Sequence, residues 1–408
     1  MLLPEDCNMG KILLVTNIYP LPSALNEGTP VCHYFARDWA KLGYDVSVIH
    51  IQAVYPTPLY WVAKLLKKWI AAKTGSVVYA RRESEVTKFE WDGVTVYRVP
   101  SFKWWPHSKF TRRTIQKLKV YIDGELAKRE FKPDYICGHF PNPMLELLSY
   151  YGKKYHAKTC YISHGDVDII RNVYRDNYRQ LLSEIDVFGF RSEPIKVNFE
   201  KIFGKKERSF ICYSGVPENY VADVSKVFDD IIHRFCFLGS LYELKRVQDT
   251  LEALHKAFPN HNFIFDIIGE GQERENLEQL AKQLGISEQV HFYGQQPRDE
   301  AQKIVSKSDY FIMVSKREAF GLVYLEAMGK GLICIGTKGQ GIDGVIRDGK
   351  NGFLCESCNP DKLAKVIQDI VSLNKDEKIR ISKAAQRTTA EMTDLKMAQY
   401  YIDSVKLL

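Results

Sequence analysis

Short apolar runs alternate with longer amphipathic segments along most of the chain. The apolar runs have the length of buried strands. In the N-terminal half they lie at 11–16, 45–50, 95–99, 135–138, 158–163, 187–190 and 209–213. Between the first two runs, residues 31–42 have helical periodicity and are followed by Gly43. Strand, loop, helix, glycine and strand is the pattern of βαβ units in a parallel sheet.

The same alternation restarts in the C-terminal half. We expect strands at 235–239, 263–268, 290–293, 310–314 and 332–335. We expect helices at 247–257, 273–284, 298–306 and about 321–330. Two successive sets of this kind predict an α/β protein with two doubly wound, Rossmann-like domains that face each other across a cleft.

The length of 408 residues also favours two domains, because a single core stops growing well below that size. The polar stretch 217–230 has no strong periodicity and separates the two sets of elements. We therefore expect an N-terminal domain over 1–223 and a C-terminal domain over 224–390. Residues 391–408 are expected to form a C-terminal helix that crosses back to the first domain.

Composition narrows the class of protein. The apolar share of 45% and the charged share of 26% are those of an ordinary globular protein, which argues against disorder, collagen and coiled coil. No apolar run is long enough to span a membrane, and the start lacks the basic segment of a secretory signal. Nine scattered cysteines, with a lone Cys355-x-x-Cys358 pair, favour reduced thiols over a metal site. We expect a cytoplasmic protein.

The strongest candidate chemistry follows the expected strand 310–314. In an open parallel sheet, ligands bind beyond the carboxyl ends of the strands. Gly321 begins a helix whose unpaired N–H groups and positive dipole end suit a phosphate. Glu318 precedes this helix and Glu326 lies within it, about 12 Å away along the axis, a reach comparable to that from a ribose to a sugar on the same diphosphate. The alternative is that Glu318 caps the helix and Glu326 is a solvated surface charge.

Three further clusters follow strands of the C-terminal half. Lys245, in the segment after Gly239, places a cation where the phosphates of a leaving group would lie. Gly269-Glu270-Gly271 is a tight turn that lets a backbone approach a ligand closely, and Gly339-Gln340-Gly341 is similar. Their position at strand ends of one expected sheet indicates one shared site.

These clusters together resemble a known family. The order Gly239…Lys245, Gly269-Glu-Gly271, Phe292-Tyr-Gly294, Glu318-x7-Glu326 and Asp348-Gly-Lys-Asn-Gly352 resembles the donor-binding domain of retaining GT-B glycosyltransferases, family 4 (glycosyl transferases group 1). The resemblance covers about residues 230–375. The N-terminal half is similar only through Gly28 and His164. Two departures are Ser240, where the family often has Arg, and Asp343-Gly344, where it often has Pro-Glu.

The resemblance implies a set of site residues. The catalytic residues would be Glu318, Lys245 and His164. The donor contacts would be made by Gly28, Ser240, Lys245, Gln296, Glu318, Phe320, Gly321, Leu322 and Glu326.

Each implied residue has a role in the family. Glu318 would contact hydroxyls of the donor sugar, and Glu326 those of the ribose. Lys245 would neutralise the departing diphosphate. The backbone around Phe320, Gly321 and Leu322 would hold the sugar and diphosphate, and Gln296 would lie by the nucleobase. Gly28 would let its loop approach the phosphate, and His164 would face the sugar and the acceptor.

The implied reaction transfers a sugar from a UDP- or GDP-sugar to a hydroxyl, with retention of the anomeric configuration. The acceptor would be lipid-linked or a polysaccharide, as in bacterial cell-surface glycan synthesis. The two glutamates are too far apart for a glycosidase pair, so we expect front-side displacement. No metal and no cofactor are expected besides the nucleotide-sugar co-substrate, because Lys245 and the helix end take the place of Mg²⁺. A nucleotide-sugar epimerase of the same architecture is the alternative.

Basic and aromatic residues gather in the N-terminal half. Residues 55–130 hold 16 Lys and Arg against 7 Asp and Glu, and all six tryptophans lie in the first 105 residues. On a helical wheel, residues 61–70 place their tryptophans and aliphatic side chains opposite their lysines, as in a helix at an anionic membrane surface. We expect a possible membrane contact through 61–73 and 103–119; the alternative is that the apolar half packs on the sheet.

A basic nucleic-acid-binding protein is an alternative from another class. The sequence has no recognisable RRM, helix-turn-helix or zinc-finger pattern, so we expect no nucleic-acid partner.

Overall fold

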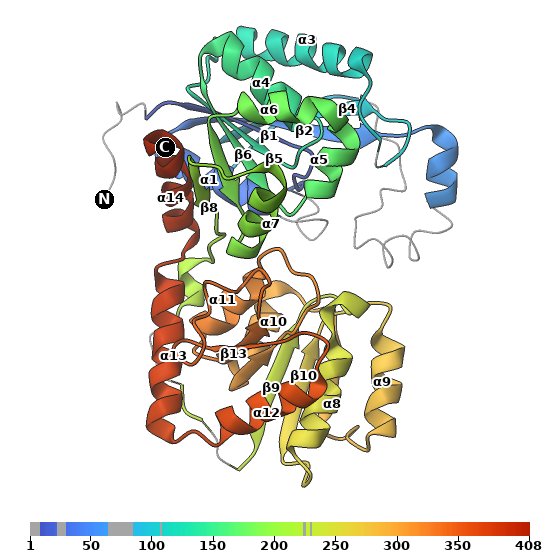
Figure 1. Ribbon diagram of the computed structural model, residues 1–408, viewed down its shortest axis with the longest axis vertical. Coiled ribbons are helices and arrows are strands. Elements are labelled where there is room, and N and C mark those ends of the chain that lie inside the picture. Colours follow the sequence, from blue (N-terminus) through green and yellow to red (C-terminus); the bar gives the residue numbers. More distant parts are fainter. Residues whose placement is uncertain (1–8, 23–29, 64–84, 107, 223–225, 229–230) are drawn as a thin grey trace. The chain divides into compact units, whose positions relative to one another are not determined.

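The computed structural model describes residues 9–22, 30–63, 85–106, 108–222, 226–228 and 231–408 (Figure 1). The chain divides into two compact units. Unit 1 comprises Met1–Arg191, Ile195–Tyr213 and Asp394–Leu408; unit 2 comprises Ser192–Pro194 and Ser214–Thr393. The main passage between them, at Tyr213 and Ser214, comes earlier than the expected end of the first domain at residue 223.

Unit 1 has an eight-stranded sheet in the order β3-β4-β2-β1-β5-β6-β7-β8. The strands are β1 (Lys11–Thr16), β2 (Asp45–Val54), β3 (Thr87–Trp91), β4 (Val94–Phe102), β5 (Tyr135–His139), β6 (Lys158–Ser163), β7 (Val187–Phe190) and β8 (Ser209–Ile211). All neighbours are parallel except β3 and β4. The sequence analysis missed β3, which forms a hairpin whose turn residues Asp92 and Gly93 both have positive φ.

Helices cover both faces of the unit 1 sheet (Figure 1). They are α1 (Val31–Lys41), a helix over residues 57–63, α3 (Arg112–Lys128), α4 (Met144–Tyr155), α5 (Val167–Tyr174), α6 (Tyr178–Ser183), α7 (Glu193–Phe203) and α14 (Asp394–Leu407). One apolar cluster joins the sheet to α3, α4 and α5, and the other joins it to α1 and α14. On the second face, Trp39 of α1 donates from Nε1 to the carbonyl oxygen of Ala398 in α14, at 2.9 Å.

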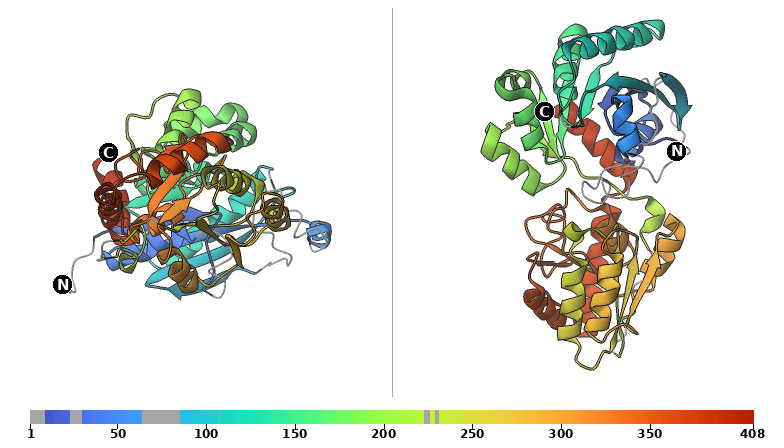
Figure 2. Two further views of the ribbon diagram at one scale, coloured as in Figure 1. Left: turned by 90° about the horizontal axis from the view of Figure 1, so that it is seen from below. Right: turned by 90° about the vertical axis from the view of Figure 1, so that its right-hand side faces the viewer.

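Unit 2 has a six-stranded parallel sheet in the order β11-β10-β9-β12-β13-β14, again with helices on both sides (Figure 2). The strands are β9 (His233–Leu238), β10 (Phe263–Ile268), β11 (Val290–Gly294), β12 (Tyr310–Ile312), β13 (Ile333–Thr337) and β14 (Phe353–Cys355). The helices are α8 (Val247–Ala257), α9 (Arg274–Gln283), α10 (Arg298–Ser306), α11 (Leu322–Gly329), α12 (Pro360–Val371) and α13 (Lys375–Ala390). α8 packs with α9 and α12, whereas α11 packs with α10 and α13.

The strand order of each sheet fixes where a ligand is expected. In unit 2 the chain leaves β9 toward β10 on one side and later places β12 on the other side. In unit 1 the corresponding reversal lies between β1 and β5. Loops at such a switch point splay apart and leave room for a ligand beyond the carboxyl ends of the strands. The loops after β9 and β12 carry Lys245 and Glu318.

Two of the buried histidines of unit 1, His50 and His139, are held in the uncharged form. His50 on β2 and His139 on β5 are almost fully buried, and burial lowers the pKa of each to about 3. Positive neighbours, Arg98 for His50 and Arg191 for His139, lower the pKa further. Folding therefore requires both rings to be neutral.

We predict that the free energy of unfolding falls as the pH drops below about 6.5, the pKa of an unfolded histidine. Between that pH and about 3, the unfolded chain binds a proton that the folded chain excludes, which at pH 5 costs about 2 kcal/mol for each buried ring. In urea unfolding at pH 7 and pH 5, His50→Asn should reduce this pH-dependent loss by about that amount. The exposed His156→Asn should leave it unchanged; equal losses in both variants would contradict the prediction.

Candidate functional site

The Lys245–Glu318 ion pair lies at the switch point of unit 2. Lys245 ends the short 3-10 helix η3 (Glu243–Lys245) after β9, and Glu318 lies in the loop after β12. The ammonium Nζ of Lys245 is 2.6 Å from Oε2 of Glu318. The two side chains are 24% and 16% exposed, so the pair remains accessible from solvent. The sequence analysis placed these residues on phosphate and sugar respectively; the structure brings them into direct contact.

Three strand-end loops are joined around this pair. The amide of Lys316 donates to the carbonyl of Leu244 at 2.8 Å, which ties the loop after β12 to the loop after β9. The amide of Glu318 donates to Oε1 of Gln340 at 3.1 Å, and the amide of Gly341 donates to the carbonyl of Glu318 at 3.0 Å. A Cβ on Gly341 would lie 2.4 Å from the backbone of Ala319, so this contact requires glycine.

The turn Gly269-Glu270-Gly271 packs against the loop after β9. A Cβ on Gly269 would lie 1.9 Å from the carbonyl oxygen of Gly239, and one on Gly271 would lie 2.2 Å from that of Leu241. The amide of Leu241 donates to the carbonyl of Glu270 at 2.9 Å. The close approach expected of this turn is therefore made to a neighbouring loop, and it fixes the segment that carries Lys245.

The helix α11 begins at Leu322, with Gly321 as its N-cap in the left-handed region at φ 82°. A Cβ on Gly321 would lie 2.7 Å from the ring of Tyr324, whose hydroxyl donates to the carbonyl of Met313. Phe320 is buried just before the cap, and Leu322 is partly exposed. The first N–H groups of this helix have no helical carbonyl partner and point beyond its N-terminus.

Glu326 lies in a different environment from Glu318. It is only 6% exposed, and it faces α10, from which Arg298 donates to its Oε1 at 2.8 Å and Gln302 donates to its Oε2 at 2.6 Å. The guanidinium of Arg298 also lies over the ring of Tyr220, 4.9 Å from the centroid. The interpretation of Glu326 as a solvated surface charge is thus wrong.

Ser240 and Gln296 are further residues implied for the donor site. Ser240 is exposed in the loop after β9. Arg246 does not replace the arginine expected there, because its guanidinium binds Asp249 in two hydrogen bonds of 2.6 and 3.0 Å. Gln296 donates from Nε2 to the carbonyl of Tyr293 at 2.6 Å. Their roles toward a donor stay predictions.

His164 belongs to unit 1 and lies directly after β6. Its Nε2 is 3.1 Å from Nδ1 of His139, whose Nε2 is 3.3 Å from the hydroxyl of Tyr401 on α14. The ring of Phe140 stacks on His164 at 4.0 Å between centroids. Burial and the neighbouring His139 lower the pKa of His164, so the ring is neutral. Gly28, the other residue implied in this unit, lies outside the described residues.

Sequence reasoning missed several partners of these groups. Arg298 and Gln302 are four residues apart on α10, a spacing that places both on one helix face and signals a shared contact. His139 ends β5 as His164 follows β6, and these two strands are parallel neighbours. For Gln340, no sequence signal indicated a side-chain contact with the amide of Glu318.

Three further observations hold for the described part of the chain. It contains no group of three or more His, Cys, Asp or Glu side chains arranged to hold a metal ion. Its cysteines are all free thiols, of which Cys358 alone is exposed. None of its helices combines the length and apolar character that crossing a membrane requires.

We predict that Glu326→Ala lowers the free energy of unfolding by about 2 kcal/mol, because it leaves Arg298 and Gln302 without their acceptor in a buried place. Glu326→Gln should cost less, since it keeps an acceptor oxygen. Urea unfolding measures both. Glu278→Ala, which breaks an exposed pair with Arg274, is the matched control and should change stability by less than about 0.5 kcal/mol. An equal effect of the two alanine variants would contradict the structural role of Glu326.

Comparisons with known proteins match part of this chain to a known family. Residues 222–388 match the family model described as Glycosyl transferases group 1. The chain is 36% identical over 142 residues to N-acetyl-alpha-D-glucosaminyl L-malate synthase of Bacillus anthracis, covering 35% of this chain and 36% of the relative. It is 35% identical over 108 residues to the lipopolysaccharide core biosynthesis glycosyltransferase LpsE of Rhizobium meliloti, covering 26% and 31%.

The chain thus spans about a third of the length of these relatives. Among solved structures, Anabaena HepE in complex with UDP has a TM-score of 0.68 at 16% identity, with 98% of this chain and all of that chain covered. The chain therefore has the GT-B fold, and its residues 222–388 match the glycosyl transferases group 1 family.

Proposed function

We propose that the protein is a retaining glycosyltransferase that moves a sugar from a nucleotide-diphosphate sugar to an acceptor hydroxyl. The observation that carries this proposal is the Lys245–Glu318 pair at the switch point of unit 2, beside the N-terminus of α11. UDP is the favoured nucleotide, because a structure of similar fold holds it. An acceptor in cell-surface glycan synthesis is supported by the name of one relative, a lipopolysaccharide core glycosyltransferase.

In this proposal the pyrophosphate of the donor docks against the N-terminus of α11, where unpaired N–H groups and the helix dipole stabilise it. The ammonium of Lys245 has three N–H donors and gives one to Glu318, so it can also neutralise the charge that develops on the leaving phosphate. Glu318 has a free oxygen lone pair for a sugar hydroxyl. Glu326, held rigid by Arg298 and Gln302, accepts from the ribose.

The proposed reaction is front-side displacement. The bond from the anomeric carbon to the leaving phosphate breaks on the face where the acceptor oxygen arrives, and the departing phosphate oxygen takes the acceptor's proton. Retention without a covalent intermediate fits the two glutamates, because they bind different partners and do not form the carboxylate pair of a glycosidase. Lys245 and the start of α11 supply the positive charge, so the reaction needs no metal or other cofactor.

We predict that Lys245→Ala lowers kcat for sugar transfer by about 10²- to 10³-fold, since it removes a charge that acts mainly on the leaving group. A thermal-shift panel of UDP- and GDP-sugars first identifies the donor, because a ligand that binds only the folded protein raises the melting temperature. Turnover is then measured with that donor in excess EDTA, where the wild-type enzyme should keep its full rate.

Lys256→Ala is the matched control, because this lysine is an exposed residue of α8 that pairs only with Asp361 among the contacts described. It should turn over as the wild type does. An unchanged kcat in Lys245→Ala would show that Lys245 does not stabilise the leaving phosphate. A thermal-shift panel with no nucleotide-sugar binding would overturn the proposed function.

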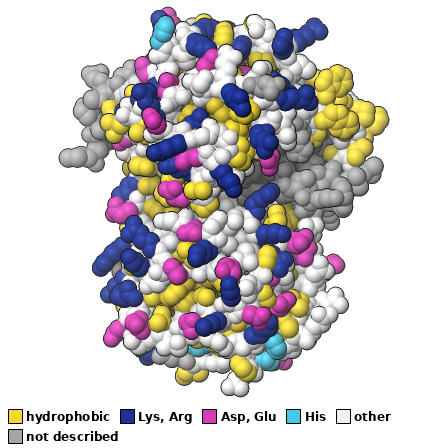
Figure 3. Space-filling view, viewed as in Figure 1, with side chains coloured by type: hydrophobic (Ala, Val, Ile, Leu, Met, Phe, Trp, Pro, Cys, Tyr) yellow, Lys and Arg dark blue, Asp and Glu magenta, His cyan; other side chains and the backbone are white. Residues whose placement is uncertain are grey.

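We also propose that unit 1 docks on an anionic membrane surface. The side chains of Trp61, Trp104 and Trp105 are 68%, 59% and 63% exposed, so these three do not pack in the core. Figure 3 shows apolar side chains gathered along an edge of unit 1, with Lys and Arg nearby. Exposed tryptophans beside basic residues are typical of interfacial contacts. Residues 64–70 of the amphipathic segment 61–70 lie outside the described residues.

We predict that the triple variant Trp61→Ser, Trp104→Ser, Trp105→Ser binds vesicles containing phosphatidylglycerol at least about tenfold more weakly than the wild type does, because each tryptophan contributes apolar area to the interface. Vesicle flotation measures the bound fraction. Val197→Ser, an equally exposed apolar residue of α7, is the control and should bind normally. A wild-type protein that floats with neither anionic nor neutral vesicles would refute membrane docking.

A further inference from the structure

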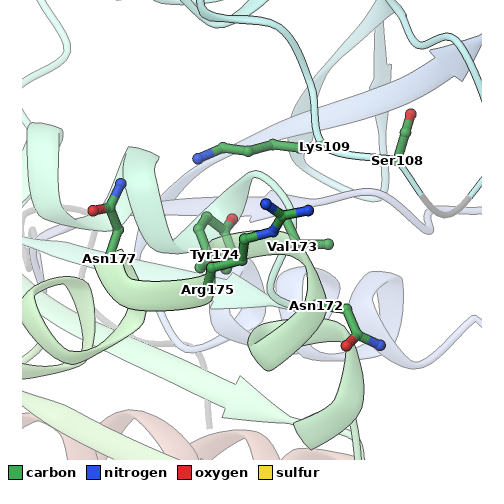
Figure 4. A pocket seen from close by; sticks show the side chains of 7 residues that line it. All are labelled: Ser108, Lys109, Asn172, Val173, Tyr174, Arg175 and Asn177. Carbon is green, nitrogen blue, oxygen red and sulfur yellow. The ribbon is translucent and has the colours of Figure 1, made fainter.

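Unit 1 contains a cavity of about 530 Å³ that none of the residues implied for the donor lines. It lies between the loop that leads into α3 and the C-terminal end of α5 (Figure 4). Its walls are Ser108, Lys109, Asn172, Val173, Tyr174, Arg175 and Asn177. This volume is within the range of small-molecule sites.

The cavity is lined by two cations and two amides. Lys109 and Arg175 reach over it from opposite walls, and Asn172 and Asn177 lie at its sides (Figure 4). The ammonium Nζ of Lys109 lies 3.2 Å from Oε1 of Glu146. This ion pair leaves further N–H donors of Lys109 available. Among the side chains that the structure describes, none forms an ion pair or hydrogen bond with the guanidinium of Arg175. Lys109 and Arg175 therefore have N–H donors available for a ligand.

Glu146 does not line the cavity itself but contacts Lys109, one of the residues that do. Its Oε1 accepts from Lys109, and its Oε2 lies 3.2 Å from the hydroxyl of Tyr174. Lys119 also lies near Glu146 and opposes its charge. The positive charges of Lys109, Lys119 and Arg175 together outweigh the negative charge of Glu146.

Arg175 has a backbone conformation that favours glycine. It follows α5 with φ 46° and ψ −116°, which a residue with a Cβ rarely adopts. Backbone outliers of this kind cluster at binding sites, where the surrounding structure fixes them. Here the outlier places an arginine side chain at the wall of the cavity.

The cavity is connected to the segment that holds His164. Tyr174, in its wall, donates from its hydroxyl to the carbonyl of Pro141 at 2.7 Å. Pro141 follows Phe140, whose ring stacks on His164. His164 precedes α5 and Arg175 follows it, so the two are separated by one helix of eight residues, about 12 Å in length.

We propose that this cavity binds a phosphate group of the acceptor substrate. Only the identification of the ligand as the acceptor rests on the proposed glycosyltransferase function. The phosphate site itself rests on the cavity alone. A guanidinium fork and an ammonium facing each other, with amides beside them, match the several oxygens of a phosphate. When its phosphate is held there, the rest of an acceptor about as long as a sugar extends along α5 toward His164.

The test uses Arg175→Gly in the full chain. Glycine suits φ 46°, so the variant should keep the thermal stability of the wild type while it removes the charge. Arg179→Gln, a nearby exposed arginine that does not line the cavity, is the matched control. All variants also carry Lys245→Ala, so that phosphate does not bind at the proposed donor site beside Lys245. Calorimetric titration with inorganic phosphate and with glycerol 3-phosphate should show at least about tenfold weaker binding in Arg175→Gly and unchanged binding in Arg179→Gln.

A second set of titrations identifies the source of the phosphate. Binding of the soluble ions through Arg175 indicates a soluble phosphorylated acceptor. Arg175-dependent binding only to phosphatidylglycerol vesicles, with phosphatidylcholine vesicles as control, indicates a lipid phosphate. If Arg175→Gly and Arg179→Gln bind phosphate and vesicles alike, the site is refuted. Arg175-dependent phosphate binding in a protein that binds no nucleotide sugar would instead refute the proposed function and leave the phosphate site standing.

Discussion

The backbone contacts among the strand-end loops of unit 2 hold the rest of the candidate site in place. Leu241, Leu244 and Glu318 each exchange backbone hydrogen bonds with a neighbouring loop. Gly269, Gly271 and Gly341 approach those loops so closely that no side chain fits between them. Because loops joined in this way cannot move independently, the Lys245–Glu318 pair has a defined position before any ligand arrives. Preorganised charge of this type is what stabilises a developing negative charge most effectively.

The two glutamates of the Glu-x7-Glu motif show how one helix can offer two kinds of carboxylate. Glu318 lies outside α11, partly exposed, with a single strong partner and spare hydrogen-bonding capacity. Glu326 lies inside α11, nearly buried, and is positioned by two residues of α10. The first is suited to respond to a ligand, whereas the second is suited to stay fixed. The same residue type thus serves two purposes because its surroundings differ.

Much of the fold could be predicted from the sequence, because alternating buried strands and amphipathic helices leave a strong periodic signal. The expected start of α11 at Gly321 was correct within one residue, since glycine readily adopts the left-handed conformation of that cap. The antiparallel strand β3 was missed because its residues are mostly exposed and lack an apolar run. Within the candidate site, strand-end positions indicated which loops matter, but not that Glu318 would pair with Lys245. The spacing of Arg298 and Gln302 on α10 indicates a shared contact, but that this contact is Glu326 depends on how α10 and α11 pack.

Unit 1 is built from both ends of the chain. Its helix α14 contributes Ala398, Tyr401, Ile402 and Val405 to the apolar cluster that also contains Phe35 and Trp39. On the ribosome, these early residues are synthesised long before α14, so the part of this face that α14 covers stays exposed while unit 2 is made. A protein truncated by its last fifteen residues would retain every residue of the nucleotide-sugar motif and still lack part of a core. The unit that begins to fold first therefore completes its core only after unit 2 has been synthesised.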